Sequence, residues 1–156
     1  ILLNTNGSIR DEQWWWDFGI KVRNRTTVYW AIEGITNEQH AHYRRHTDLN
    51  KILRNMDSFS AAGGISEVFT VVFKHNQKDI YNIAKLSRDH GAKQIMFVKS
   101  NRFYENMSYK FINELGDEEQ LIKSTLPENS EFYWKSWDLK NSNHMEIIFN
   151  ESIKAQ

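Results

Sequence analysis

Hydrophobic positions in the first hundred residues follow two alternating patterns. Short apolar runs rich in β-branched and aromatic residues predict buried strands at residues 1–6, 26–35, 67–74 and 94–98. Apolar residues at three- and four-residue spacing predict helices between them: a short one that includes residues 14–16, one from Thr47 or Asp48 to Phe59, and one over 78–90. Strands alternating with helices are typical of right-handed βαβ units, so we expect an α/β fold with a parallel sheet.

The pattern weakens in the last third of the chain. There it predicts a short helix over 118–125, a loop at Pro127 and a fifth strand at 145–149. At 156 residues the chain is too short for a complete eight-unit barrel. We therefore expect an open parallel sheet with an unpaired edge at its first strand, followed by an irregular C-terminal third.

Composition narrows the classes of partner. Twenty basic and twenty acidic residues cancel, which leaves no overall field to attract nucleic acid or an anionic membrane. Trp14 and Trp16 lie beside acidic residues, so we expect the tryptophans to pack on the sheet and not to stack on bases. The longest apolar run, 68–73, is far shorter than the roughly 20 residues of a membrane helix. We expect a cytoplasmic protein without nucleic-acid or membrane partners.

Candidate chemistry lies at the carboxyl ends of the predicted strands, where parallel α/β folds place their ligands. Polar side chains follow four strands, at residues 4–7, 31–34, 74–76 and 98–100. Simpler roles stay open for each of them. Asn6 and Gly7 form a common turn pair, Asn76 can cap the following helix, and Glu33 needs a cation, a ligand or the solvent because an unpaired buried carboxylate is costly.

Three histidines and two arginines lie close together after the second strand. The spacing of His40, His42 and His46 argues against a metal site, because residues two apart diverge on a helix and no carboxylate completes the set at a recognisable spacing. Arg44 or Arg45 could hold a carboxylate or phosphate at a pocket rim, and solvent exposure is the alternative for at least one of them.

Several of these segments follow one another in a distinctive order: Thr5-Asn6-Gly7, Ala31-Ile32-Glu33-Gly34-Ile35, His40 with Tyr43-Arg44-Arg45, and residues 70–76, which end in Asn76. Together they resemble the middle strands of radical S-adenosylmethionine (SAM) enzymes. The most similar branch often carries extra C-terminal clusters and modifies peptides or proteins. The resemblance covers residues 1–100. It implies an α/β fold that is a partial (β/α) TIM-type barrel with outer helices, in which residues 1–100 are the central βα units and residues 101–156 an irregular C-terminal extension of the same domain. It also implies SAM and a [4Fe-4S] cluster as cofactors and a peptide as a candidate substrate.

Carried over position by position, the resemblance implies a set of cofactor-binding residues: Thr5, Asn6, Glu33, Arg44, Asn76 and Val98. Ala31 stands where the family has serine, which removes a hydroxyl contact to the cofactor. Glu33 replaces an aspartate and places the charge one methylene further out. Val98 falls where backbone groups flank the adenine in relatives.

The largest departure from the family is the absence of cysteine. Without it these residues cannot form disulfides or hold an iron–sulfur cluster through thiolates. The family's first strand and its Cys-x3-Cys-x2-Cys loop should precede Ile1, and the glycine-rich motif that receives the SAM amino group after the second strand is missing, so the chain alone should be inactive. We expect a fragment of a radical SAM enzyme, lacking the N-terminal part of the barrel, whose parent would generate a 5′-deoxyadenosyl radical on an unidentified substrate.

Two other functions stay open. One is a degenerate, cysteine-less barrel that binds a ligand or partner without catalysis. The other is an unrelated α/β barrel hydrolase that uses Glu33 with a second carboxylate, although no partner acid is evident in the sequence.

Overall fold

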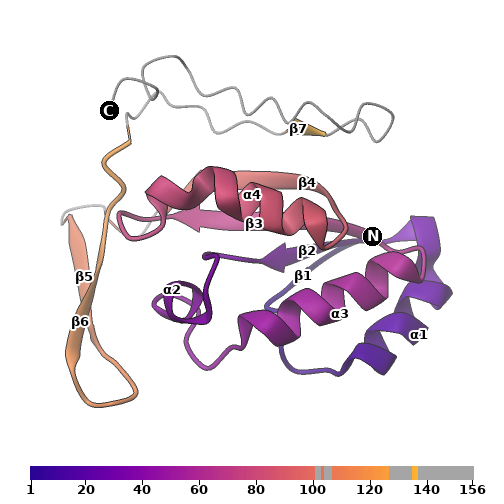
Figure 1. Cartoon of the computed structure of the whole chain (residues 1–156), viewed down its shortest axis with the longest axis horizontal. Helices are drawn as coiled ribbons and strands as arrows, with labels where there is room; N and C mark the ends of the chain where they lie inside the picture. The colour runs from indigo at the N-terminus through magenta and orange to yellow at the C-terminus, as the bar shows by residue number, and fades with distance from the viewer. Residues whose placement is uncertain (101–102, 104–106, 127–134, 137–156) are drawn as a thin grey trace.

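Four parallel strands form the centre of the computed structural model, which describes residues 1–100, 103, 107–126 and 135–136. They are adjacent in sequence order: β1 (Leu2–Thr5), β2 (Thr27–Ala31), β3 (Ile65–Val72) and β4 (Ala92–Lys99). A two-residue strand, β7 (Lys135–Ser136), pairs antiparallel with β4. The predicted parallel α/β sheet is confirmed, and β1 lies at its edge as expected (Figure 1).

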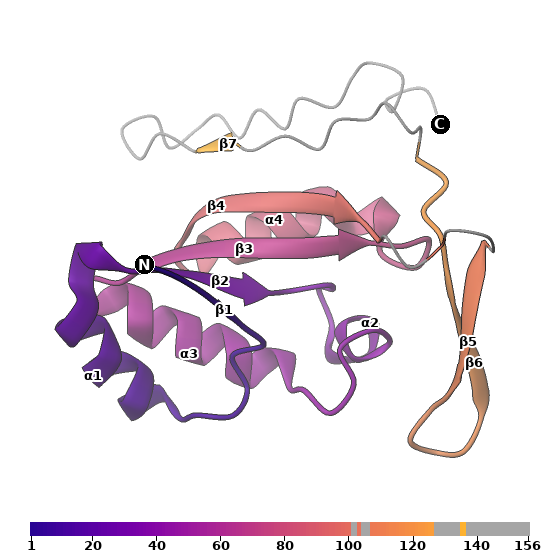
Figure 2. The same cartoon turned by 180° about the vertical axis from the view of Figure 1, so that it is seen from behind.

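Helical segments connect the strands: α1 (Glu12–Val22), η1 (Arg23–Arg25), α2 (Asn37–Ala41), α3 (Leu49–Ala61), η2 (Gln77–Asp79) and α4 (Ile80–Asp89). The three long helices α1, α3 and α4 lie on one face of the sheet (Figures 1 and 2). Short α2 lies instead near the carboxyl ends of the strands. Asp48 caps α3, because its side chain accepts hydrogen bonds from the backbone N–H groups of Asn50 and Lys51.

The main core forms where these helices meet the sheet. Every second residue of a strand faces the helices, so Val28 and Trp30 of β2 are fully buried beside Phe59 of α3. Trp15 of α1 packs with its ring centroid 4.5 Å from that of Trp30, as expected for the tryptophan segment. Trp14 on the same helix stays 39% exposed.

A β-hairpin follows the main sheet and corrects the prediction of a helix over 118–125. Its strands, β5 (Ser108–Ile112) and β6 (Glu118–Ile122), pair antiparallel, and Leu121 packs with Phe73 and Phe103 in a second small core. The segment is extended because it pairs with β5, and its period of two then places Glu119 and Leu121 on the same side. Figure 2 shows the hairpin beyond the carboxyl ends of β3 and β4. The fifth strand expected at 145–149 lies outside the described residues.

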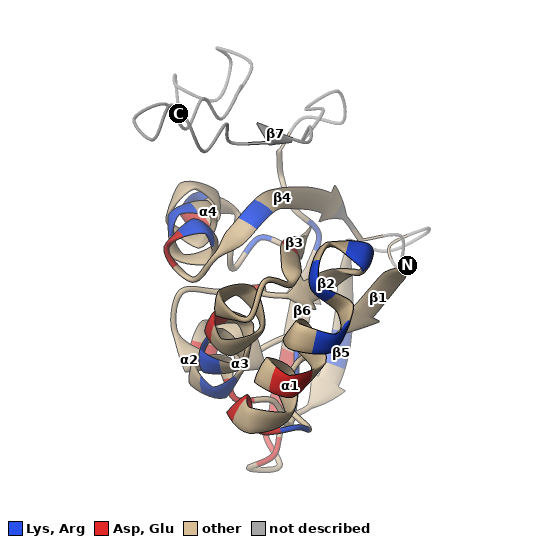
Figure 3. Cartoon of the chain, turned by 90° about the vertical axis from the view of Figure 1, so that its right-hand side faces the viewer, with Lys and Arg blue, Asp and Glu red and all other residues tan. Residues whose placement is uncertain are grey.

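Basic and acidic residues occur together on the described helices. In Figure 3, both α1 and α4 carry residues of both signs, in keeping with equal numbers of acidic and basic residues in the chain. In the described part of the chain, no helix has the length and apolar character needed to cross a bilayer.

Candidate functional site

The site begins where β2 runs past its last pairing partner. Ala31 pairs with Phe69, but the chain continues to Ile32 and Glu33 outside the ladder. Side chains hold these two residues instead: the Thr70 hydroxyl donates to the Ile32 carbonyl at 2.6 Å, and the Asn76 amide donates to the Glu33 carbonyl at 3.0 Å. Glu33 is thereby fixed at the carboxyl edge of the sheet with its side chain fully buried.

The Asn76 side chain also forms hydrogen bonds with backbone groups at the end of β3. Its Nδ2 also donates to the Val71 carbonyl at 3.0 Å, and its Oδ1 accepts from the Phe73 N–H at 2.8 Å. The predicted role as a helix cap is therefore wrong, because the side chain turns inward and makes no capping hydrogen bond to η2. Asn76 instead links the end of β3 to the Glu33 backbone.

Four residues close a ring of hydrogen bonds around Glu33. The Glu33 N–H donates to Nδ1 of His40 at 3.2 Å, and Nε2 of His40 lies 3.0 Å from Oγ1 of Thr47. That hydroxyl donates to the Arg44 carbonyl at 2.5 Å. Nη2 of Arg44 completes the ring by donating to Oε1 of Glu33 at 2.9 Å.

The hydrogen bonds of the ring assign the proton on His40. Nδ1 accepts from the Glu33 N–H, and Thr47 gives its hydroxyl proton to Arg44, so Nε2 carries the single imidazole proton. Burial, reinforced by the charge of Arg44, lowers the pKa of His40 to about 4. The imidazole is therefore neutral near pH 7, and the 3.8 Å between its Nδ1 and Oε2 of Glu33 is not an ion pair.

The charges of Glu33 and Arg44 are only partly matched. Burial raises the pKa of the Glu33 carboxyl, although the hydrogen bond and charge of Arg44 lower it in part. Within the described part of the chain, Oε2 of Glu33 and Nε of Arg44 are buried without a hydrogen-bond partner. The Arg44 side chain is nevertheless 30% exposed, so the site presents a guanidinium held from behind by a buried carboxylate.

The close approach of α2 to the end of β2 requires a glycine. A Cβ on Gly34 would lie 2.6 Å from the backbone nitrogen of His40, closer than any side chain permits. Gln39 then ties α2 to the neighbouring turn: its Oε1 accepts from the Ile35 N–H at 2.8 Å, and its Nε2 donates to Oδ2 of Asp79 at 2.8 Å. These contacts fix His40 and Arg44 relative to Glu33.

The structure brings together three of the six predicted site residues, Glu33, Arg44 and Asn76. Val98 lies one strand away, paired with Val71 and packed against the second small core. Thr5 and Asn6 are occupied within their own turn. Oγ1 of Thr5 accepts from the Gly7 N–H at 2.9 Å, and Oδ1 of Asn6 accepts from the Ser8 N–H at 3.4 Å.

Sequence reasoning did not assign His40, Thr47 and Thr70 to the site. The four-residue spacing of His40 and Arg44 was a usable signal, because it places both side chains on one side of a helical turn. Thr47 and Thr70 carried no such signal, since their roles depend on carbonyl groups that only the fold brings near. Among the described residues, no group of three or more histidine, cysteine, aspartate or glutamate side chains could hold a metal ion.

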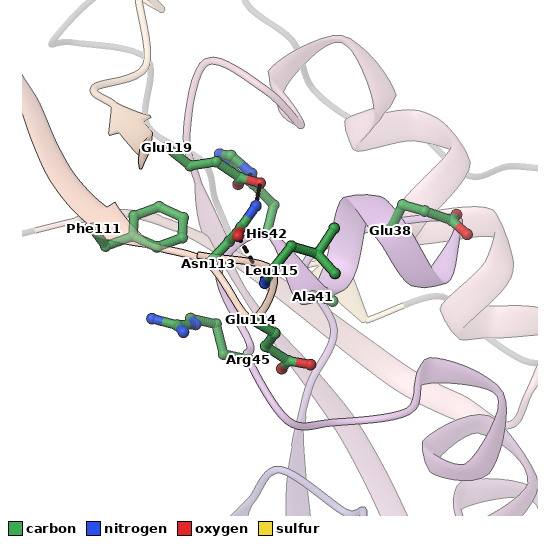
Figure 4. Close-up of a pocket in the computed structure, with 9 residues that line it drawn as sticks. All are labelled: Glu38, Ala41, His42, Arg45, Phe111, Asn113, Glu114, Leu115 and Glu119. Carbon is green, nitrogen blue, oxygen red and sulfur yellow. Dashed lines mark hydrogen bonds and ion pairs between the residues drawn. The ribbon is translucent and has the colours of Figure 1, made fainter. Parts of the chain in front are cut away.

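A second feature lies beside this ring, on the other side of α2. A pocket of about 380 Å³ opens between α2, the turn after it and the tip of the β5–β6 hairpin (Figure 4). Nδ1 of His42 lies 2.9 Å from Oε2 of Glu119, and Nδ1 of His46 lies 3.0 Å from Oε1 of Glu114. The guanidinium of Arg45 lies over the Phe111 ring at 5.3 Å. One partly exposed and one exposed histidine–carboxylate contact thus join the hairpin to the turn after α2.

No protein-family model and no curated protein matches the chain. Solved structures do: anSMEcpe with bound AdoMet (SAM) is 16% identical with a TM-score of 0.51, over 68% of this chain and 31% of that one. The complex of anSMEcpe with AdoMet and the Kp18Cys peptide is equally similar, with 16% identity and a TM-score of 0.51 over 67% of this chain. A polyhistidine-tagged form of anSMEcpe reaches 18% identity with a TM-score of 0.50.

These structures are radical SAM enzymes, so the described part of the chain has the fold of part of a radical SAM barrel. The likeness at this identity concerns the fold. The chain spans 31% of the length of anSMEcpe.

Proposed function

We propose that this chain forms part of the SAM pocket of a radical SAM enzyme. The observation that carries the proposal is Arg44, whose partly exposed guanidinium lies at the carboxyl edge of the sheet on a fully buried Glu33. A guanidinium binds a carboxylate through two parallel hydrogen bonds, and SAM carries one carboxylate. SAM is also bound in the similar anSMEcpe structures, which supports the same cofactor here.

The residues at this edge fit such a cofactor. The exposed part of the Arg44 guanidinium is open to an acceptor that the chain itself does not supply, whereas Nε is buried and has no partner among the described residues. Glu33 would keep Arg44 charged and in place, and Asn76 would hold the Glu33 backbone. Val98, Thr5 and Asn6 would line the pocket from the neighbouring strands. In radical SAM enzymes the bound cofactor is the source of a 5′-deoxyadenosyl radical.

The cluster does not fit this chain. A [4Fe-4S] cluster is held by cysteine thiolates, and the sequence contains no cysteine. We therefore assign no step of the reaction to these 156 residues alone. Residues 1–100 would be the central units of a barrel whose cluster ligands lie elsewhere in a longer parent, and residues 101–156 an extension of that domain. A peptide is the proposed substrate, because a similar structure contains a bound peptide.

Calorimetric titration with SAM tests the proposal. The wild-type chain should bind SAM, and Arg44→Ala should weaken binding at least about tenfold, because it removes a charge-assisted contact to the carboxylate. Arg54→Ala is the matched control, since Arg54 of α3 pairs with Glu12 of α1 in an exposed contact at 2.9 Å that is not part of the Glu33–Arg44 ring. Equal binding by the wild type and Arg44→Ala, or no binding at all, would contradict the proposal.

A cysteine-less binding module is the second candidate. It is favoured by the complete absence of cysteine and by Ala31, which stands where the resembled family has serine. The coding sequence upstream of Ile1 separates the two. A Cys-x3-Cys-x2-Cys loop there supports the enzyme, whose anaerobic reconstitution should yield a cluster spectrum and 5′-deoxyadenosine. An in-frame start codon directly before Ile1 supports the binding module. The cytoplasmic location stays a prediction.

A further inference from the structure

We propose that protonated histidines hold the β5–β6 hairpin against the turn after α2, so that its tip docks below about pH 6 and is released above about pH 8. These histidine contacts are separate from the Glu33–Arg44 ring. The hairpin stands beyond the carboxyl ends of β3 and β4, next to the edge where the proposed cofactor site lies (Figure 2). The proposal does not depend on SAM, because it concerns contacts within the chain.

The base of the hairpin is fixed by contacts that do not titrate. The backbone N–H of Lys74 donates to the Ile122 carbonyl at 3.0 Å, and that of Lys123 donates to the Met107 carbonyl at 2.8 Å. Leu121 is buried in the second small core. A change of pH should therefore leave the base in place.

The tip also has a structure of its own. Oδ1 of Asn113 accepts hydrogen bonds from the backbone N–H groups of Leu115 and Asp117, both at 2.9 Å, and the Gly116 N–H donates to the Asn113 carbonyl at 3.2 Å. These amide groups do not change charge between pH 5 and 8. The distal part of the hairpin therefore moves as one unit when its contacts to the turn after α2 are lost.

The contacts of His42 with the hairpin require two donors. Its Nδ1 lies 2.9 Å from Oε2 of Glu119, and its Nε2 lies 3.1 Å from the carbonyl oxygen of Gln120. A carboxylate and a carbonyl only accept hydrogen bonds, whereas a neutral imidazole has a single N–H. The docked hairpin therefore selects the imidazolium, because loss of its proton leaves a nitrogen lone pair facing an acceptor. At the tip, Nδ1 of His46 lies 3.0 Å from Oε1 of Glu114 and adds a second contact of the same kind.

The titratable groups from the other elements that face His42 keep one form over this range of pH. A hydrogen bond from Asn113, assisted by the charge of His42, lowers the pKa of Glu119, so its carboxylate stays ionised. The ring of His75, in the turn after β3, lies 4.6 Å from that of His42 between centroids. Burial and the charge of His42 lower the pKa of His75 to about 4, so this second ring stays neutral.

Two further charged groups stand near His42 on its own segment. Arg45 stays charged and lies over the Phe111 ring, so it attracts the hairpin equally at every pH of this range. Glu38, one turn earlier on α2, is engaged with the side chain of Thr36. The docked hairpin thus binds more protons than the released one through its histidine contacts, and a rise in pH favours release.

Distances between two spin labels test the proposal. The chain contains no cysteine, so Leu115→Cys at the hairpin tip and Tyr81→Cys on α4, both at exposed residues, carry the only labels. Electron paramagnetic resonance without SAM should give one narrow distance distribution at pH 5.5. At pH 8.5 a second population should appear, with a docked-to-released ratio about tenfold lower, because two weak ion pairs are lost. Identical distributions at both pH values, or a second population only at pH 5.5, would overturn the proposal.

Matched variants locate the titrating group. His42→Gln should remove most of the difference between the two pH values, whereas His42→Lys, which stays charged, should hold the tip docked at pH 8.5. His90→Gln is the control, because His90 pairs with Asp57 at 2.8 Å by the same chemistry, between the end of α4 and α3. A full response in His42→Gln, or a lost response in His90→Gln, would overturn the proposal. If His42→Gln does not melt cooperatively, Glu119→Gln replaces it and should show the released population at both pH values.

The SAM proposal can fail independently of this one. The spin labels report on the hairpin without SAM, and His42→Gln should keep SAM binding. A missing pH response with intact SAM binding would refute the histidine contacts as a pH-dependent clamp alone, whereas absent SAM binding with an intact pH response would refute the proposed function alone.

Discussion

Arg44 and Arg45 are neighbours in sequence but lie in opposite environments. Arg44 turns toward the sheet and donates to fully buried Glu33, within a ring that also contains His40 and Thr47. Arg45 turns toward the hairpin and lies over Phe111, beside the partly exposed contact between His42 and Glu119. One turn of chain thus supports two sites of different character.

The two regions differ in how easily water reaches their polar groups. In the ring, polar groups have lost water and each hydrogen bond compensates for that loss, so removing one partner leaves another uncompensated. At the hairpin, water can replace a lost partner. Substitutions of the same chemical kind should therefore have unequal effects in the two regions.

Removing a carboxylate from each region should give the largest contrast. Glu33→Ala leaves the Arg44 guanidinium without its counter-charge and opens a cavity, which should lower the free energy of unfolding by about 3 kcal/mol. Glu119→Ala removes a partly exposed partner of His42 and should cost much less, because water can replace the lost contact. Urea denaturation measures both. Equal losses would show that the two regions do not differ in the way described.

Acid should weaken the ring through His40. Its pKa is lowered to about 4, so the stability that its neutral form contributes is present above about pH 6.5 and is lost as the pH falls through about 4. The loss due to His40 should be roughly 2–3 kcal/mol over this window.

Two other groups share that window. The pKa of His75 is also lowered to about 4 by burial and by His42, which adds to the loss, whereas the raised pKa of Glu33 acts in the opposite direction. Comparison with His40→Gln isolates the contribution of His40, because glutamine can make both hydrogen bonds without titrating. Thermal melts at pH 7 and 4.5 should show a smaller difference for His40→Gln, while 75% exposed His46 can be replaced by glutamine without that change.

Replacing a glycine by alanine should destabilise the ring region more than the hairpin, because less space is available for the added methyl group. Gly34→Ala forces a Cβ to within 2.6 Å of the His40 backbone nitrogen, which should cost about 2 kcal/mol. Gly116→Ala in the hairpin meets no atom within 4 Å, so only its φ of +89° should matter, at about 1 kcal/mol. Chemical denaturation of the two variants gives the comparison, and a larger loss for Gly116→Ala would contradict it.

Salt should give the smallest contrast. Exposed ion pairs are screened far more than buried ones, so the cost of Glu119→Ala should be smaller at about 1 M salt than at about 0.05 M. The cost of Glu33→Ala should stay constant over the same range. Paired unfolding curves at both salt concentrations measure this, and a salt-dependent cost at Glu33 would indicate that water reaches the ring.

Most of the fold could be predicted because local periodicity matches tertiary burial. The helix expected to start at Thr47 or Asp48 is α3, and the strand expected at 94–98 is the centre of β4. The prediction of a helix over 118–125 was wrong, because the segment contains too few apolar residues to distinguish helical from extended periodicity. Its pairing with β5 and the contact of Leu121 with Phe73 decide the outcome, and neither is local.

The site was predictable only in part. Strand ends and a family resemblance pointed to Glu33, Arg44 and Asn76, whose types suit a polar pocket. The hydrogen bonds among them could not be predicted, because they depend on tertiary contacts. The Asn76 side chain donates to the carbonyls of Glu33 and Val71 and does not cap a helix, since the fold places Glu33 beside it. The hairpin pocket had no signal at all, since its two sides are more than sixty residues apart in sequence.

A nitrogen-15 NMR titration of the chain with SAM tests the central claim most directly. Backbone amides of Glu33, Gly34 and Arg44 should shift with SAM concentration, while those of Leu115 and Glu119 in the hairpin should stay in place. Arg44→Ala should abolish the shifts, and Arg45→Ala should leave them. Shifts confined to the hairpin, or none at millimolar SAM, would contradict the assignment of the cofactor to the Glu33–Arg44 ring.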